Sequence, residues 1–145
     1  MNVDWSLIRN PFLDREPGVS ARDPALLWHD GVFRCFHTAA ERREGRYVLF
    51  LDVTESQDLA QWFVPRRLTT SELGFSSPGN VIRAGDKWLL CVQSYPIPPG
   101  EVYGSEASRL WLMASDDLVT WADPQPIAPH GCQAEWAESA RQIDP

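Results

Sequence analysis

The heptapeptide SQDLAQW at residues 56–62 returns in the second half of the chain as SDDLVTW at residues 115–121. Both copies fit the pattern Ser-x-Asp-Leu-x-x-Trp, and each follows a short apolar segment. The Ser and Asp side chains of such a turn accept hydrogen bonds from its own backbone, while the Leu and Trp side chains fill space between neighbouring sheets. The repeat therefore predicts two copies of one structural unit.

The segments that precede these heptapeptides also resemble each other. DGVFRCF at residues 30–36 is echoed by GDKWLLC at residues 85–91, so the units begin near residues 23, 78 and 144. Each unit has about four short strands closed by the heptapeptide, which is the content of a β-propeller blade. We predict a single domain over residues 1–145, with blade one at about 23–77, blade two at about 78–143 and a third blade starting at 144.

Short alternating or apolar runs recur between 12 prolines and nine glycines, and no long amphipathic helical pattern is present. The sequence therefore predicts an all-β fold. Asp30-Gly31 and Gly85-Asp86 are hairpin signals, and Cys132 to Gln142 is either a short helix or an irregular loop. The expected strands are Ala25 to His29, Val32 to Thr38, Arg46 to Thr54, Trp62 to Leu68, Asn80 to Arg83, Lys87 to Ser94, Arg109 to Ser115 and Gln125 to Ile127.

Composition and charge exclude several functional classes. The net charge is −7 and the 13 Lys and Arg residues are scattered, which argues against nucleic-acid binding. The N-terminal residues show no secretory pattern, and no apolar run is long enough to span a membrane. Cys35, Cys91 and Cys132 have no metal-ligand spacing and are expected to be reduced cysteines. We expect a cytoplasmic protein with no membrane partner.

Two aspartates stand directly before prolines at predicted blade starts, in Arg22-Asp23-Pro24 and in Ile143-Asp144-Pro145. A residue before proline is biased towards extended backbone, so we expect both carboxylates to be held in a fixed direction. In blades arranged around an axis, both carboxylates would face one central pocket. Asp-Pro at the start of a strand is also a common turn and cap device, which is the alternative interpretation.

Two blades and the first two residues of a third cannot close a propeller. We therefore expect either that the chain is the N-terminal part of a longer protein or that two or more chains complete the ring. Open sheet edges would then favour self-association.

The Ala21-Arg22-Asp23-Pro24 motif, the SPGNVI segment at residues 77–82, the two heptapeptide turns and Ile143-Asp144-Pro145 resemble the N-terminal part of a five-bladed β-propeller glycosidase. The resemblance is to glycoside hydrolase family 43, with families 32 and 130 as relatives. Family 32 has an Asn-Asp-Pro first and an Arg-Asp-Pro later, whereas here the arginine precedes the first aspartate.

The resemblance implies roles for the two aspartates. In family 43 an early blade-start aspartate is the general base, a second aspartate tunes the pKa of the acid and orients it, and a later glutamate is the general acid. Asp23 matches the first role and Asp144 the second, whereas the glutamate has no counterpart in this sequence. The resemblance also implies an inverting reaction, in which the acid and the base are about 6.5–9.5 Å apart to admit water.

Further residues are candidates for contact with substrate. Arg22 or Arg141 would help to keep Asp23 ionised. Ser77, Asn80, Gln93 and Ser94 could hydrogen-bond sugar hydroxyls, or could serve only as turn and strand partners. Trp28 and Tyr95 could stack on a sugar ring, or could pack between blades.

The leading interpretation is a glycosidase that acts on a carbohydrate substrate, with the 145-residue chain by itself lacking the general acid. The alternatives are a phosphorylase of the family 130 type, which needs a basic phosphate pocket, and a non-catalytic carbohydrate-binding or protein-interaction propeller. No cofactor is expected, and the three histidines, His29, His37 and His130, show no metal-ligand spacing.

Overall fold

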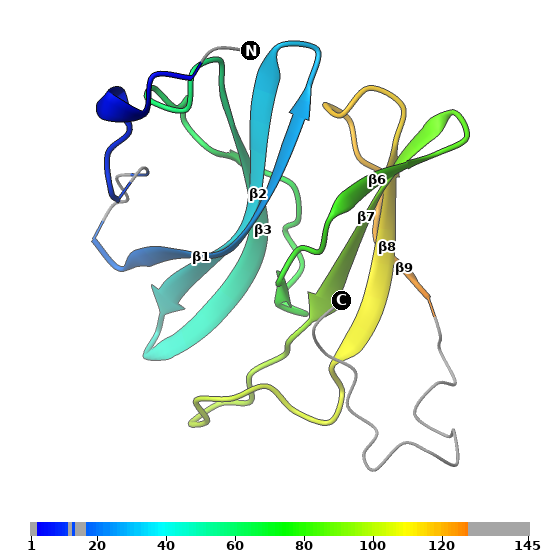
Figure 1. Ribbon diagram of the computed structural model, residues 1–145. Coiled ribbons are helices and arrows are strands. Elements are labelled where there is room, and N and C mark those ends of the chain that lie inside the picture. Colours follow the sequence, from blue (N-terminus) through cyan, green and yellow to red (C-terminus); the bar gives the residue numbers. More distant parts are fainter. Residues whose placement is uncertain (1–2, 12, 14–16, 128–145) are drawn as a thin grey trace, which may run out of the picture.

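The computed structural model describes residues 3–11, 13 and 17–127, which form two antiparallel β-sheets packed against each other (Figure 1). A short 3-10 helix, η1 (Trp5–Leu7), precedes the sheets. The strands are β1 (Val19–His29), β2 (Val32–Arg43), β3 (Arg46–Ser56), β4 (Arg66–Arg67), β5 (Phe75–Ser76), β6 (Val81–Ala84), β7 (Lys87–Ser94), β8 (Arg109–Ser115) and β9 (Gln125–Pro126).

Sheet one has the strand order β1-β2-β3-β4. The two-residue turns Asp30-Gly31 and Glu44-Gly45 join its first three strands, and all four turn residues have φ between 49° and 83°. A type I′ hairpin requires positive φ at both central positions, which glycine and aspartate adopt at low steric cost. The predicted hairpin at Asp30-Gly31 is confirmed.

Sheet two is built around β7, with β8 and β9 following on one side. On the other side, β5 and β6 both pair with β7 and are separated by residues 77–80. The two short strands therefore act as one interrupted edge strand. The predicted hairpin at Gly85-Asp86 joins β6 to β7 and is also confirmed.

The repeated heptapeptide makes the same turn in both sheets. In the first copy, Ser56 Oγ accepts the backbone N–H groups of Asp58 and Leu59 at 3.2 and 2.8 Å. Asp58 Oδ1 accepts those of Ala60 and Gln61, both at 2.9 Å. The four equivalent distances in the second copy are 3.3, 2.9, 2.8 and 2.7 Å. One sequence pattern thus closes both units by the same hydrogen bonds.

The two sheets share one apolar core. Phe36 of β2 meets the ring of Trp121 edge to face, with 5.4 Å between the ring centroids, so the tryptophan of the second heptapeptide packs on the first sheet. Phe36 is fully buried, and burying a side chain of this size stabilises a fold by roughly 1.5–3 kcal/mol. The buried cluster comprises Ala25, Phe36, Leu51 and Val53 from sheet one and Phe75, Leu90, Val92 and Met113 from sheet two.

The strand predictions differ from the structure at several points. β7 and β8 have the predicted bounds, whereas β1 starts earlier than predicted because it continues through Asp23-Pro24. The predicted strand from Trp62 to Leu68 shrinks to β4 and one isolated bridge at Trp62. Pro65 lies in that segment, and a proline has no N–H for a strand ladder. β5 was missed, and Cys132 to Gln142 lie outside the described residues.

Candidate active site

Asp23 lies at a bulge in β1. Arg22 is opposite Thr38 of β2 and Ala25 is opposite Phe36, so two residues of β1 face one residue of β2. Asp23 has φ 52°, so the prediction that it adopts extended backbone is wrong. The extra residue of the bulge turns the chain locally, and aspartate is among the non-glycine residues that tolerate positive φ. The bulge rather than the pre-proline bias therefore directs this carboxylate.

The Asp23 carboxylate is held through one oxygen. Thr38 Oγ1 donates to Asp23 Oδ2 at 2.8 Å, and Ser77 Oγ donates to the same oxygen at 3.3 Å. Thr38 is buried, Ser77 is half-buried and Asp23 is exposed. Among the described residues, Asp23 Oδ1 has no hydrogen-bond partner. One oxygen is thus fixed, while the other keeps its capacity to accept a proton.

Ser77 is the counterpart of Asp23 in sheet two. It also precedes a proline, has φ 46°, and lies where the edge strand of its sheet is interrupted between β5 and β6. Ser76 is opposite Gln93 in sheet two, as Arg22 is opposite Thr38 in sheet one. The two units therefore place an aspartate and a serine at equivalent positions, within hydrogen-bond distance of each other.

Gln93 extends this network into sheet two. Its side chain is buried, and Nε2 donates to Ser77 Oγ at 2.9 Å and to Ser76 Oγ at 3.4 Å. The structure thus brings three of the predicted site residues, Asp23, Ser77 and Gln93, into one hydrogen-bonded group. Thr38, which sequence reasoning missed as a site residue, connects them.

Other predicted residues lie apart from this group. The guanidinium of Arg22 lies over the ring of Tyr47, 6.0 Å from its centroid, and no ion pair joins Arg22 to Asp23 within the described residues. Asn80 is exposed in the segment between β5 and β6. Asp144 and Arg141 lie outside the described residues, so their predicted roles remain untested.

Ser94 and Tyr95 make contacts within the fold, whereas Trp28 is exposed. Ser94 Oγ accepts the backbone N–H of Arg109 at 3.1 Å and donates to its carbonyl at 3.5 Å, which fixes the pairing of β7 and β8. Tyr95 is half-buried, and its ring lies so close to Gly104 that a Cβ there would come within 2.8 Å of it. Trp28, on edge strand β1, is 49% exposed and so has surface to offer a ligand.

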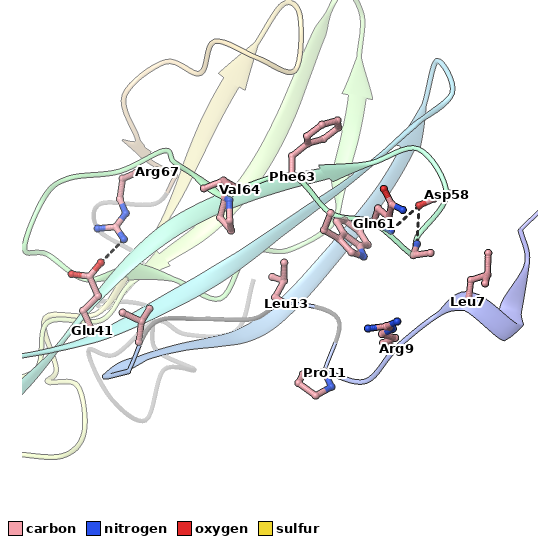
Figure 2. Close-up of a pocket in the computed structure, with 14 residues that line it drawn as sticks. Leu7, Arg9, Pro11, Leu13, Glu41, Asp58, Gln61, Phe63, Val64 and Arg67 are labelled. Carbon is pink, nitrogen blue, oxygen red and sulfur yellow. Dashed lines mark hydrogen bonds and ion pairs between the residues drawn. The ribbon is translucent and has the colours of Figure 1, made fainter.

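A cavity of about 840 Å³ lies elsewhere, between the N-terminal segment and the stretch from Asp58 to Arg67 (Figure 2). None of the predicted site residues lines it. Two of its charged lining residues, Arg67 and Glu41, contact each other, and Arg67 also contacts Asp52, at 2.7 Å from Nε to Oδ1. Arg67 also lies over the ring of Phe50 at 4.2 Å. We therefore assign a structural role to this cluster of Arg67, Glu41, Asp52 and Phe50, and we place the candidate site at Asp23.

The pKa values of Glu41 and Arg67 are determined by their ion pairs more than by burial. Burial by itself would raise the pKa of Glu41, but hydrogen bonds from Arg67 and Arg43 and their positive charges lower it overall. Burial would likewise lower the pKa of Arg67, but its bonds to Asp52 and Glu41 raise it overall. Both partners are therefore held in their charged forms.

The described residues offer no other evident reactive centre. Burial raises the pKa of the Cys35 thiol to about 11 and also raises that of Cys91, so neither is an activated nucleophile. No cluster of three or more His, Cys, Asp or Glu side chains able to hold a metal ion occurs in the described ranges. In the same ranges, no helix has the length and hydropathy needed to cross a membrane.

Comparison with known proteins gives structural matches alone. No family model and no curated protein matches the sequence. The catalytic domain of the Coprinopsis cinerea GH62 α-L-arabinofuranosidase matches with a TM-score of 0.51 and 19% identity, over 74% of this chain and 31% of that one. The Bombyx mori GH32 β-fructofuranosidase matches with a TM-score of 0.51 and 14% identity, over 73% and 23%.

A third match comes from the GH130 family of mannoside phosphorylases, which is described as containing hydrolases that target β-1,2-mannosidic linkages in Candida mannan. Its TM-score is 0.52 at 16% identity, over 74% of this chain and 32% of that one.

The present chain thus spans no more than about a third of the length of these three solved chains. The likeness at such identities concerns the fold. The predicted all-β fold is confirmed, and the chain has the structure of part of a five-bladed β-propeller of the kind found in glycoside hydrolases and in the mannoside phosphorylase family.

Proposed function

We propose that this chain carries part of the active site of an enzyme that hydrolyses a glycosidic bond, with Asp23 as the general base. The observation that supports the proposal best is the state of the Asp23 carboxylate. Two hydroxyl groups donate to Oδ2, while Oδ1 has no partner among the described residues. A general base needs this combination of a fixed direction and one oxygen that can take a proton.

The chemistry assigned to Asp23 is the activation of water. Asp23 accepts a proton from a water molecule as the water oxygen bonds to the anomeric carbon of the sugar, and the bond to the leaving oxygen breaks. The leaving oxygen must take a proton from a second group. No other carboxyl group belongs to the hydrogen-bonded network of Asp23 in the described part of the chain. We assign Asp144 the role of orienting that acid, as the resemblance to family 43 implies.

Substrate contacts are assigned to three exposed side chains outside the hydrogen-bonded group of Asp23. Trp28 is on the same strand and presents an aromatic surface, on which a sugar ring can stack. Arg22 and Asn80 are exposed polar side chains on β1 and beside β6. We propose that these three residues contact the sugar, and that Arg141 completes the polar lining.

The first experiment measures hydrolysis by the full polypeptide that contains these residues, using a panel of aryl glycosides and oligosaccharides. Asp23→Asn should lower kcat/KM by about 10²- to 10⁴-fold, which is the usual contribution of general acid–base catalysis. Asp30→Asn is a matched control, because Asp30 also has positive φ, 50°, but lies in the hairpin turn that follows β1, away from the bulge. Its activity should equal that of the unmodified protein.

Other results would redirect the proposal. Full activity of Asp23→Asn, with Asp30→Asn also active, would remove Asp23 from the mechanism. Turnover that requires inorganic phosphate and yields a sugar phosphate would replace hydrolysis by phosphorolysis. Binding to immobilised oligosaccharides without turnover of any panel member would indicate a binding protein.

A further inference from the structure

Thr38 links the Asp23 carboxylate to the second sheet. Its side chain is buried, 1% exposed, on the face of β2 towards sheet two. The Thr38 hydroxyl gives its one proton to Asp23 Oδ2 at 2.8 Å and accepts the backbone N–H of Ser77 at 2.8 Å. A hydroxyl has a single proton. The N–H of Ser77 is a donor and cannot accept that proton, so Asp23 Oδ2 is its acceptor. The hydroxyl thus holds positions in both sheets at once.

Ser77 provides the second half of the link. Its hydroxyl oxygen accepts an N–H from Gln93 Nε2 at 2.9 Å and donates to Asp23 Oδ2 at 3.3 Å. The incoming N–H occupies one lone pair of the oxygen and favours the orientation in which the Ser77 proton points to the carboxylate. Two hydrogen-bonded paths, one through Thr38 and one through Ser77 from Gln93, therefore end on the same oxygen atom.

We propose that Thr38 and Ser77 are positioning residues that hold Asp23 Oδ2, so that Oδ1 is the atom that accepts the proton from water. This inference rests on the proposed role of Asp23 as the general base. The two residues act through Asp23 and need no contact with the substrate. Because Thr38 is in sheet one and Ser77 follows β5 of sheet two, the direction of the base depends on how the two sheets pack.

Replacement of Thr38 by valine keeps the shape of the side chain and removes both of its hydrogen bonds. Asp23 would retain one long hydrogen bond, from Ser77, and its carboxylate would rotate more freely. A catalytic group displaced by about 1 Å can lose about 10²-fold in rate, so we expect kcat to fall by roughly 10- to 100-fold in T38V with little change in KM. T38S restores the hydroxyl and should recover most of kcat.

Thr54 offers a matched control on the same sheet. It is also 1% exposed, and its hydroxyl donates to the carbonyl of Phe63 at 2.6 Å, a contact that does not involve Asp23. T54V therefore removes one buried hydroxyl without touching the network. We expect its thermal stability to fall much as in T38V, while its kcat stays at the unmodified value.

A second measurement does not depend on turnover. The amide hydrogen of Ser77 is bonded to Thr38 Oγ1, so its exchange with solvent, followed by NMR, should be faster in T38V and unchanged in T54V and T38S. The amide of Ser77 should stay protected in S77A, which loses only the hydroxyl, and kcat of S77A should fall less than that of T38V.

The outcomes separate this inference from the proposed function. An active D23N variant overturns the proposed role of Asp23 and the positioning role with it. If D23N is inactive but T38V keeps full kcat while exchange at Ser77 accelerates, Asp23 is the base and the positioning role is wrong. A loss of kcat in T54V equal to that in T38V would also overturn it, because general destabilisation would then explain both.

Discussion

At the scale of single residues, the two units place strained backbone at the candidate site. Asp23 and Ser77 both have positive φ, 52° and 46°, and both precede a proline. Such backbone is unfavourable for most residues other than glycine, at a typical cost of order 1–3 kcal/mol, and aspartate tolerates it better than serine does. Here Thr38 donates a hydrogen bond to Asp23 and accepts one from the backbone N–H of Ser77, and Gln93 donates one to the Ser77 hydroxyl. Strain and its compensation therefore coincide at Asp23 and Ser77.

A pH dependence of stability belongs to the same scale and concerns Glu41. Burial is outweighed by hydrogen bonds from Arg67 and Arg43, so the folded-state pKa of Glu41 is lower than its ordinary value. A carboxyl of this kind adds stability above its unfolded pKa, about 4.3, and that contribution is lost as pH falls through the folded pKa. We expect the free energy of unfolding, measured by urea denaturation, to decrease below about pH 4.3.

The variant Glu41→Gln should flatten this part of the pH profile. Glu44→Gln removes an exposed carboxyl from the adjoining hairpin turn and serves as the control, whose profile should follow the unmodified protein. Equal profiles for Glu41→Gln and the unmodified protein would show that Glu41 contributes nothing to the acid sensitivity.

At the scale of elements, the repeated turn is the feature that sequence and structure share most closely. Ser56 and Ser115 are buried, and each accepts two backbone N–H groups of its turn. The tryptophan of each copy donates its indole N–H to the carbonyl of the preceding leucine, at 3.0 and 3.4 Å. Each turn thus satisfies several of its own polar groups by hydrogen bonds within the heptapeptide.

Loss of one of these serine hydroxyls should therefore be measurable. Ser115→Ala leaves the N–H groups of Asp117 and Leu118 without that acceptor, and we expect it to cost about 1–2 kcal/mol of unfolding free energy. Ser56→Ala should cost a similar amount. In the exposed control Ser71→Ala, the hydroxyl accepts just the N–H of Leu73, at 3.2 Å, within the part of the chain that the structure describes, and we expect less than about 0.5 kcal/mol. A cost for Ser115→Ala no greater than that of this control would contradict the assigned role of the turn.

The local sequence predicted those elements whose conformation is determined by residues close together in the chain. The turns and the strands β7 and β8 follow from side-chain pattern and turn chemistry, and the all-β fold follows from their repetition. The bulge at Asp23 was missed because its conformation is set by pairing with β2, which the pre-proline bias does not describe. β5 has two residues and is held by its pairing with β7, so no periodicity could reveal it.

At the scale of the whole molecule, each sheet has one face in the shared core and one face directed away from it. The outer face of sheet two carries Ile82, which is 56% exposed, beside half-buried Leu89 and Leu112. Across sheet one, Phe63 and Val64 are 64% and 91% exposed at the cavity shown in Figure 2. Exposed apolar side chains on opposite sides of a molecule favour head-to-tail association.

We therefore expect the 145-residue chain to self-associate as its concentration rises. Sedimentation equilibrium up to about 1 mM, where a contact with a Kd of 1 mM is well populated, should show a concentration-dependent mass. Ile82→Glu should reduce the association by placing a charge on the outer face, whereas Val102→Glu, on the 69% exposed Val102 of a distant loop, should not. A constant monomer mass over the whole series would refute the expectation.

The candidate site also belongs to the scale of the whole molecule, because its residues come from both sheets. Asp23 was predicted from its place at a blade start and Ser77 as a polar residue that could hydrogen-bond sugar. The role of Thr38 was not predicted, because nothing in its local sequence distinguishes it from the other residues of β2. Its partner Ser77 comes from the other sheet and lies 39 residues away in the sequence. Only the packing of the two sheets brings the hydroxyl to both residues.

The equivalence of Asp23 and Ser77 limits how acidic groups can be distributed over the repeats. The Asp23 carboxylate and the Ser77 hydroxyl are only 3.3 Å apart, so an aspartate at both positions would put two negative charges in contact. Two carboxylates at such a distance cannot both stay ionised and would share one proton. Neighbouring repeats therefore cannot both keep an ionised acid at this position, and an acidic side chain in one unit restricts its neighbour to a neutral partner.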